Sequence, residues 1–163
     1  MNIAKAKEFA IAKHGNQKYG EYPYSYHLAQ VSQVLAQFGY AGDEAIAAAG
    51  WLHDTLEDTP TTYEMLVSEF GEETADIVWA VTTEPGENRV QRFRTTALKI
   101  QSNKKALIVK LADRIANTEA GLQSNPKLYK MYLKEFPLFK QLLYNPQDIE
   151  LMAMWNRLET SKK

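Results

Sequence analysis

The chain has 163 residues, of which 45% are hydrophobic, and a formal net charge of −1. This length predicts one domain, residues 1–163, with enough apolar side chains for a core. The near-zero net charge argues against nucleic acid and anionic membrane as partners, because both bind strongly basic surfaces.

The lack of cysteine limits the chemistry of a possible site, and the lack of a membrane or signal segment bears on the cellular compartment. The chain has no cysteine, which excludes disulfides, thiolate metal sites and cysteine nucleophiles and fits a reducing compartment. No stretch approaches the roughly 18 apolar residues of a membrane helix, and the first residues lack the pattern of a signal peptide. We therefore expect a cytoplasmic protein.

Helical periodicity dominates the first part of the chain. Residues 3–14 place apolar side chains on one face. Residues 25–39 form a second apolar stripe that opens on Ser25, a candidate N-cap, and ends at a glycine. A third helix is expected from Asp43, another candidate cap, to the break at Pro60.

Two shorter helices and a loop follow in the middle of the chain. Thr61 and Glu64 predict a capping box for a helix that ends at Gly71, and residues 72–83 predict the next helix. Residues 84–88, with the sequence "EPGEN", predict a loop.

The last third is also expected to be helical. Helices are predicted over residues 89–101 and 103–121. The runs "DIVWAV" and "ALIVK" could be buried strands if taken alone, but their flanks favour helix. Late helices over about residues 126–158 are expected to break near Pro137 and Pro146 and to pack on the rest. The pattern predicts an all-α domain.

The stretch "WLHDTLEDTPTT" concentrates one imidazole and three carboxyl groups where a helix leaves the apolar run. These residues are His53, Asp54, Glu57 and Asp58. Helical spacing would let the three acids share a face, where their repulsion weakens a bare helix and a cation would remove that cost. Taken alone, the His53-Asp54 doublet is weak evidence and favours a capped helix end with solvated acids.

Two distant residues favour a metal site over a solvated helix end. His27 lies near the start of a preceding helix, and Asp113 lies inside the apolar run "LIVKLADRIANT". A buried carboxylate needs a partner, which Arg114, a helix cap or a metal ion could each supply. Two imidazoles with two carboxylates suit Mn²⁺, Fe²⁺ or Zn²⁺.

The order His27, His53-Asp54, Asp113 resembles the HD-domain metal-dependent phosphohydrolases. More narrowly, "HDTLEDTPTTYEMLVSEFG" followed by "VKLADRIANT" resembles the hydrolase domain of the RelA/SpoT group and the stand-alone small alarmone hydrolases, over residues 4–140. The resemblance implies a compact helical HD-domain bundle that hydrolyses (p)ppGpp. The chain leaves no room for the synthetase domain of the long members, so hydrolysis alone is expected.

The resemblance also implies roles for individual residues. It makes His27, His53, Asp54 and Asp113 the ligands of Mn²⁺, or of another first-row divalent ion. It makes Glu57 and Asp58 the acids that handle the attacking water, and it places Asn117 and Tyr132 at the substrate. A nearby carboxylate can take the water proton, so elementary chemistry agrees with that division of roles.

Two departures from the family pattern bear on the substrate. Leu28 stands where the family usually has a proline after the first histidine. The upstream stretch "KHGNQKYGEYPYSYH" lacks the arginine that stacks on guanine in the family. Lys18 and Tyr19 fall in that region, where Lys18 could contact a phosphate and Tyr19 could stack on a base. Neither side chain replaces the paired N–H donors of an arginine guanidinium. Weak discrimination between bases is therefore expected.

The remaining cations and the third histidine carry weaker signals. The cations available for substrate phosphates are Lys13, Lys18, Arg89, Arg92, Arg94, Lys110 and Arg114. The sequence "RVQRFR" places Arg89 and Arg92 on one helical face, although such charges more often only solvate a helix. His14 is expected at the surface.

Three functions stay open on the sequence alone. The first is hydrolysis of (p)ppGpp at the 3′ position. The second is the same metal chemistry on another nucleotide or on a phosphomonoester. The third is a non-catalytic nucleotide-binding module. In each case the expected partner is a small phosphorylated nucleotide, with no nucleic acid and no membrane.

Overall fold

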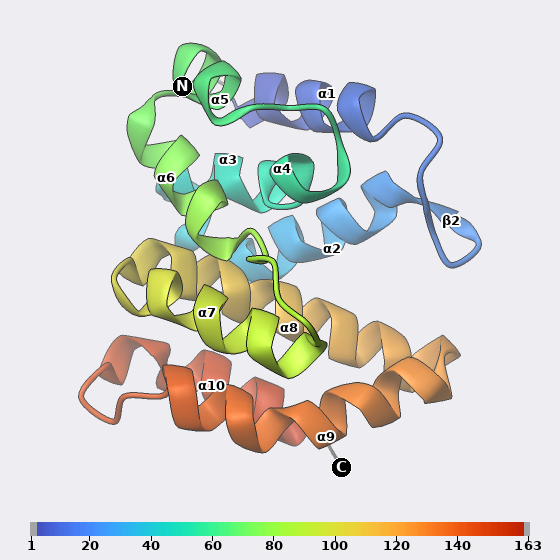
Figure 1. Ribbon diagram of the computed structural model, residues 1–163, viewed down its shortest axis with the longest axis vertical. Helices are drawn as coiled ribbons and strands as arrows, with labels where there is room; N and C mark the ends of the chain where they lie inside the picture. Colours follow the sequence, from blue (N-terminus) through green and yellow to red (C-terminus); the bar gives the residue numbers. More distant parts are fainter. Residues whose placement is uncertain (1–2, 162–163) are drawn as a thin grey trace.

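The computed structural model describes residues 3–161 and is almost entirely helical (Figure 1). The expectation of an all-α protein is therefore confirmed, apart from a small hairpin of two two-residue strands in which Lys18 pairs with Pro23. The elements, in chain order, are α1 (Ile3–His14), β1 (Lys18–Tyr19), β2 (Tyr22–Pro23), α2 (Tyr24–Gln37), η1 (Tyr40–Gly42), α3 (Glu44–Leu52), α4 (Thr55–Asp58), α5 (Tyr63–Phe70), α6 (Glu72–Val81), α7 (Arg89–Gln101), α8 (Lys104–Ser124), α9 (Pro126–Leu143), η2 (Ile149–Leu151) and α10 (Met152–Thr160).

Helix α8 is the centre of the fold. It packs against α2, α3, α6, α7, α9 and α10, and Figure 1 shows it between the upper helices and the lower layer of α9 and α10. A helix that is buried on most sides needs small or apolar residues all round. Val109, Leu111, Ala112 and Ile115 are fully buried on α8, so the apolar run that could have been a strand forms the middle of this helix.

The helix expected from Asp43 to Pro60 is interrupted after Leu52. Asp54 has φ −101° and ψ 2°, so the chain turns there before the single helical turn of α4. The Thr55 hydroxyl donates to the Leu52 carbonyl at 2.7 Å, which is the local competition with helix bonding expected of threonine. The expectation of one continuous helix was therefore wrong, and its break lies at the His53-Asp54 doublet.

Of the N-caps expected at Asp43 and Ser25, the first is confirmed and the second is wrong. Asp43 caps α3 as predicted, because its carboxylate accepts a bond from the Ile46 amide at 3.0 Å. Ser25 does not cap α2, which begins at Tyr24 behind the extended Pro23.

The capping box with Thr61 was also wrong, by one residue. Thr62 accepts a bond from the Met65 amide and caps α5. Thr61 is instead buried, and its hydroxyl pairs with that of Thr59 at 2.7 Å.

The late helices confirm one of the two expected breaks. The chain leaves helix α9 before Pro146, but α9 runs through Pro137 without ending. Pro137 is exposed, so water can satisfy the carbonyl that a proline leaves unpaired.

Two other expectations concern the packing of the late helices on the rest of the domain and the lack of a membrane-spanning helix. Helices α9 and α10 both contact α8, while residues 1–2 and 162–163 of the expected single domain lie outside the described part. None of the helices described here combines the length and the apolarity needed to cross a membrane.

The Asp43 cap is expected to be a measurable part of the stability. Asp43→Ala should lower the free energy of unfolding by about 1 kcal/mol, the usual value of such a cap, whereas Asp43→Asn keeps the cap. Partial burial raises the pKa of Asp43, but Lys105 and the backbone amides outweigh it, so its pKa is lowered on folding. The charge-dependent part should therefore be present above about pH 4 and be lost as the pH falls.

Urea denaturation of the three proteins at pH 7 and at low pH checks this expectation. Equal stability of Asp43→Ala and wild type at pH 7 would contradict it.

Candidate functional site

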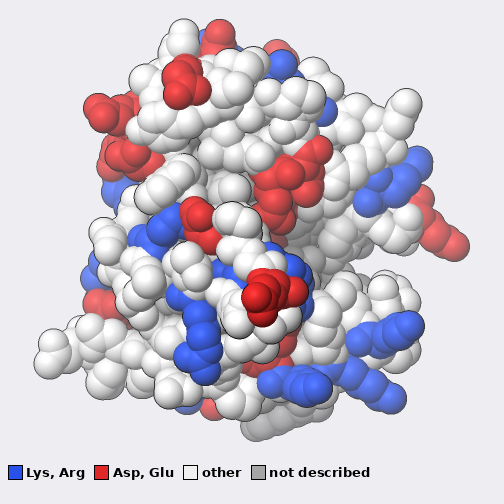
Figure 2. All heavy atoms as spheres, in the orientation of Figure 1, with Lys and Arg blue, Asp and Glu red and all other residues white. Residues whose placement is uncertain are grey.

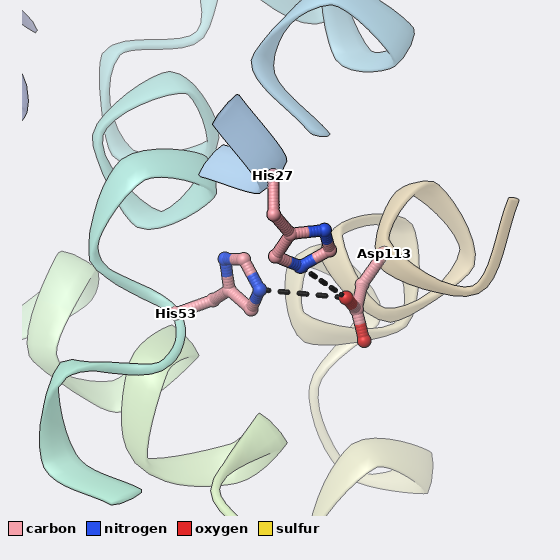
Figure 3. Close-up of side chains that lie close together, drawn as sticks. All are labelled: His27, His53 and Asp113. Carbon is pink, nitrogen blue, oxygen red and sulfur yellow. Dashed lines mark ion pairs between the residues drawn. The ribbon is translucent and has the colours of Figure 1, made fainter. Parts of the chain in front are cut away.

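The structure brings the four expected metal ligands together at the centre of the molecule. His27 comes from the first turns of α2, His53 and Asp54 from the break after α3, and Asp113 from the middle of α8. His27 Nε2 lies 3.0 Å from Asp113 Oδ1 and 3.8 Å from Asp54 Oδ2. His53 Nε2 lies 3.0 Å from Asp54 Oδ2 and 3.4 Å from Asp113 Oδ1. Figure 3 shows both imidazoles directed at the Asp113 carboxylate.

Local bonding sets the orientation of His53. Its Nδ1 lies 2.9 Å from the Gly50 carbonyl and donates to it, which leaves Nε2 as the nitrogen that faces the carboxylates. Nε2 is buried and forms no hydrogen bond of regular geometry among the described residues, although Asp54 Oδ2 and Asp113 Oδ1 lie within 3.4 Å of it. A buried polar atom without a regular hydrogen bond is costly, and this one points at a group of possible metal ligands.

The electrostatics of the cluster favour a positive charge at its centre. Burial disfavours the charge on Asp54, but the adjacent His53 outweighs it and lowers the pKa of Asp54 to about 2. Burial also disfavours the charge on Asp113. Lys110 and the two histidines outweigh that effect and hold the pKa of Asp113 well below its usual value. Burial lowers the pKa of His53, yet the two carboxylates raise it overall.

This donor set fits a divalent cation. One atom each from His27, His53 and Asp113 lie within 4.8 Å of one another, all three residues are buried, and Asp54 adds a second carboxylate beside them. Imidazole and carboxylate together suit first-row divalent metals. Such an ion would give His53 Nε2 a regular bonding partner and supply the positive charge that the carboxylates favour.

Two tyrosines hold the carboxylates of the cluster, Tyr24 by a direct hydrogen bond and Tyr19 through Asn117. The Tyr24 hydroxyl donates to Asp54 Oδ2 at 2.5 Å. The Tyr19 hydroxyl donates to Asn117 Oδ1 at 2.7 Å, and Asn117 Nδ2 donates to Asp113 Oδ1 at 2.8 Å. Outer partners of this kind fix the orientation of metal ligands. The hairpin region is thereby tied to both acids.

The two candidate catalytic acids lie in different surroundings. Glu57 lines the central cavity, and its Oε1 accepts a bond from the Thr83 amide at 2.8 Å. Asp58 accepts a bond from Gln17 Nε2 at 3.0 Å, and it is not among the described residues that line this cavity. Burial raises the pKa of Asp58.

The central cavity has a volume of about 290 Å³ and contains three of the four expected substrate residues. Lys18 is the exception, because it lies outside the described lining. Tyr19 is present, but its ring stacks on His27 at 4.7 Å between centroids. The lining residues are Tyr19, Tyr24, His27, His53, Asp54, Glu57, Val81, Thr83, Arg89, Val109, Lys110, Asp113, Asn117, Leu128 and Tyr132.

Three residues near the site were missed or misplaced by the sequence reasoning. Tyr24 lies three residues before His27 on α2, and that spacing on one helical face was a signal for it. Gln17 carried no signal. The expectation that His14 lies at the surface was wrong, because it is buried, lies 2.7 Å from Gln17 Oε1 through its Nδ1, and packs against Tyr24.

Comparison with known proteins identifies the family. A family model described as HD domain matches residues 6–142. The chain belongs to the HD domain family. The four expected metal ligands, His27, His53, Asp54 and Asp113, all lie within the matched residues.

Curated relatives of this HD domain are alarmone enzymes by name. A probable guanosine-3′,5′-bis(diphosphate) 3′-pyrophosphohydrolase from Synechocystis is 40% identical over 142 residues, which cover 82% of this chain and 18% of that protein. The guanosine-3′,5′-bis(diphosphate) 3′-pyrophosphohydrolase MESH1 of Xenopus tropicalis is 35% identical over 119 residues, which cover 71% of this chain and 66% of MESH1. The HD domain therefore spans less than a fifth of the first relative and about two thirds of the second.

A solved structure supports the fold. A metazoan ortholog of SpoT, described as hydrolysing ppGpp, superimposes with a TM-score of 0.80 at 24% identity, covering 98% of this chain and 94% of that one. The Listeria monocytogenes protein lmo0812 superimposes with a TM-score of 0.63 at 23% identity, over 83% of this chain and 98% of that one. The helical bundle of this HD domain is thus the fold of both.

The bond from Tyr24 to Asp54 yields a test of the metal centre. Tyr24→Phe removes the hydroxyl that orients the carboxylate, so the affinity for Mn²⁺ should fall by about 10- to 100-fold, the usual effect of losing such a partner. Isothermal titration with Mn²⁺ measures it. Tyr22→Phe is the matched control, because Tyr22 is exposed and stacks on Tyr26 away from the cluster. Equal affinities in the two variants would refute the role of Tyr24.

Proposed function

We propose that this HD domain is a metal-dependent phosphohydrolase that removes pyrophosphate from the 3′ position of (p)ppGpp. Mn²⁺ is the expected ion, and other first-row divalent metals are alternatives. The observation that carries the proposal is the convergence of the His27, Asp54 and Asp113 side chains on His53 Nε2, which forms no hydrogen bond of regular geometry among the described residues. The named activities of the relatives point to the substrate. We place the enzyme in the cytoplasm, in alarmone turnover during the stringent response.

The residues around the cluster suit hydrolysis of a phosphate ester. A divalent cation bound there would lower the pKa of water and neutralise phosphoryl oxygens. Glu57 lines the same cavity, and the Thr83 amide holds one of its oxygens, which leaves the other to take a proton from water. Lys110 and Arg89 also line the cavity and offer positive charge to the substrate phosphates.

Asp58 and Tyr132 have further proposed roles. Gln17 holds the Asp58 carboxylate, so we propose that Asp58 acts as the second acid of the pair. Burial, together with the nearby Asp113 charge, raises the pKa of Tyr132 to about 12. Its hydroxyl therefore stays protonated at neutral pH and can donate a hydrogen bond to substrate.

A second candidate is the same chemistry on another phosphorylated nucleotide. Both polar atoms of the Asn117 amide are engaged, one by Tyr19 and one with Asp113. One face of the Tyr19 ring is covered by His27. Tyr19 and Asn117, which were expected to contact the nucleoside, are therefore already engaged by other groups of the protein. This favours a site that recognises phosphates more than the base.

The proposed chemistry separates turnover from metal binding. Glu57→Gln should keep the bound Mn²⁺ near the wild-type amount and lower kcat for ppGpp by roughly 100-fold or more, since it removes the group that accepts the water proton. His53→Ala should lose the metal itself. Release of pyrophosphate and elemental analysis measure the two effects. A fully active Glu57→Gln protein would contradict the role of Glu57, and binding of ppGpp without turnover in the metal-loaded wild type would indicate a non-catalytic module.

The contacts of Tyr19 and Asn117 also lead us to expect weak base discrimination. The ratio of kcat/KM for ppGpp to that for its adenine counterpart should be tenfold at most, or about 1.4 kcal/mol. An aromatic ring stacks on any base with little preference. A ratio above about a thousandfold would mean that other groups read the guanine edge. The measurement needs only the wild-type enzyme and the two nucleotides.

A further inference from the structure

A second cavity, of about 380 Å³, lies between α7 and α9 beside the central one. The two cavities share Thr83, Arg89 and Lys110 in their linings. A single ligand can therefore extend from the metal cluster into the second cavity. The other residues of its lining are Val90, Arg92, Phe93, Thr96, Arg114, Met131, Lys134, Glu135, Leu138 and Phe139.

The second cavity carries an excess of positive charge. Five cations and one carboxylate line it, although the chain as a whole has a net charge of −1. The carboxylate is that of Glu135, which is shared by Arg89 and Arg114. Arg92 and Lys134 form no ion pair with any described residue. Figure 2 shows Lys and Arg side chains gathered over the lower half of this face, which α7 and α9 occupy.

The floor of this cavity would strengthen a contact with an anion. Phe93 and Phe139 stack with centroids 5.6 Å apart, and the Arg114 guanidinium lies 4.4 Å from the centre of the Phe139 ring. Apolar walls exclude water and lower the local dielectric, so that a charge–charge contact there is worth more than at an open surface. The aromatic packing also fixes Arg114 in place before any ligand arrives.

The central cavity is more acidic. Asp54, Asp113 and Glu57 line it, and the lysine and arginine in its described lining, Lys110 and Arg89, are those that it shares with the second cavity. It can accept the reacting end of a substrate at a bound cation, but its acids would repel a further phosphate placed away from that cation and from the shared Lys110 and Arg89. A substrate with two separate phosphate groups needs another place for the group that does not react. The basic cavity next to it meets that requirement.

We infer that the α7–α9 cavity is a subsite for the second, non-reacting phosphate group of a doubly phosphorylated nucleotide, with Arg92 and Lys134 as its specificity residues. This inference rests on the proposed function and deepens it. The enzyme then selects substrates by the presence of two phosphate groups at opposite ends of the nucleoside, and it does so with α7 and α9, outside the metal cluster.

The test compares ppGpp with guanosine 3′-diphosphate, which lacks the 5′ phosphates. In the Arg92→Gln/Lys134→Gln variant, KM for ppGpp should rise about tenfold with kcat unchanged, because the lost contacts are remote from the reacting group. The kinetics for guanosine 3′-diphosphate should stay within about twofold of wild type. Lys127→Gln/Lys130→Gln is the matched control, since it removes the same charge from exposed positions of α9 outside both described linings.

Binding in the Glu57→Gln background with Mn²⁺ separates this inference from the proposed function. If wild type hydrolyses neither substrate but the Arg92/Lys134 change weakens ppGpp binding alone, the proposed function fails and the subsite stands. An equal loss for both nucleotides, a similar loss in the control variant, unchanged affinity, or no ppGpp binding at all would overturn the subsite. Circular dichroism shows whether each variant is folded, and Lys134→Gln alone, at an exposed position, repeats the comparison if the double variant is not.

Discussion

Two carboxylates that face the same buried imidazoles are the constraint on which the rest of this structure depends. Asp54 and Asp113 each approach His53 Nε2 within 3.4 Å, and repulsion between buried like charges is costly unless positive charge lies between them. Hydrogen bonds from Tyr24 and Asn117 relieve part of that cost. A divalent cation would relieve the remainder, so the cluster and its supports make sense together as a metal centre.

The fold delivers these groups by combining one rigid element with one interruption. Helix α8 is packed on most sides, and this rigidity gives Asp113 a fixed position in the core. The break after α3 releases the backbone at Asp54, which lets adjacent residues direct their side chains at one point. In an uninterrupted helix His53 and Asp54 would diverge by about 100°. The short α4 then returns Glu57 to the same cavity.

Much of this arrangement could be predicted from the sequence, because helical periodicity and the order His27, His53-Asp54, Asp113 are local or linear features. Other parts depend on contacts between distant segments. The burial of His14 follows from its packing on Tyr24, and the role of Tyr19 follows from a bond across 98 positions to Asn117. The break before α4 depends on the hydrogen bond from the Thr55 hydroxyl to the Leu52 carbonyl. Composition and residue spacing do not determine whether that bond forms.

The division of charge between the two cavities would let a nearly neutral protein favour the highly charged substrate proposed for it. Three acids line the central cavity, where a cation would bind, whereas five arginines and lysines from α7, α8 and α9 line the second cavity. Together the two cavities would favour a molecule with one phosphate group at the metal centre and another at a distance set by the protein. Arg89 and Lys110 border both cavities, so in the proposed complex they would lie between the two anionic ends of the substrate, where a neutral nucleoside offers little charge to recognise. Selectivity would then come from the spacing of phosphates, which fits the engagement of Tyr19 and Asn117 by other groups of the protein.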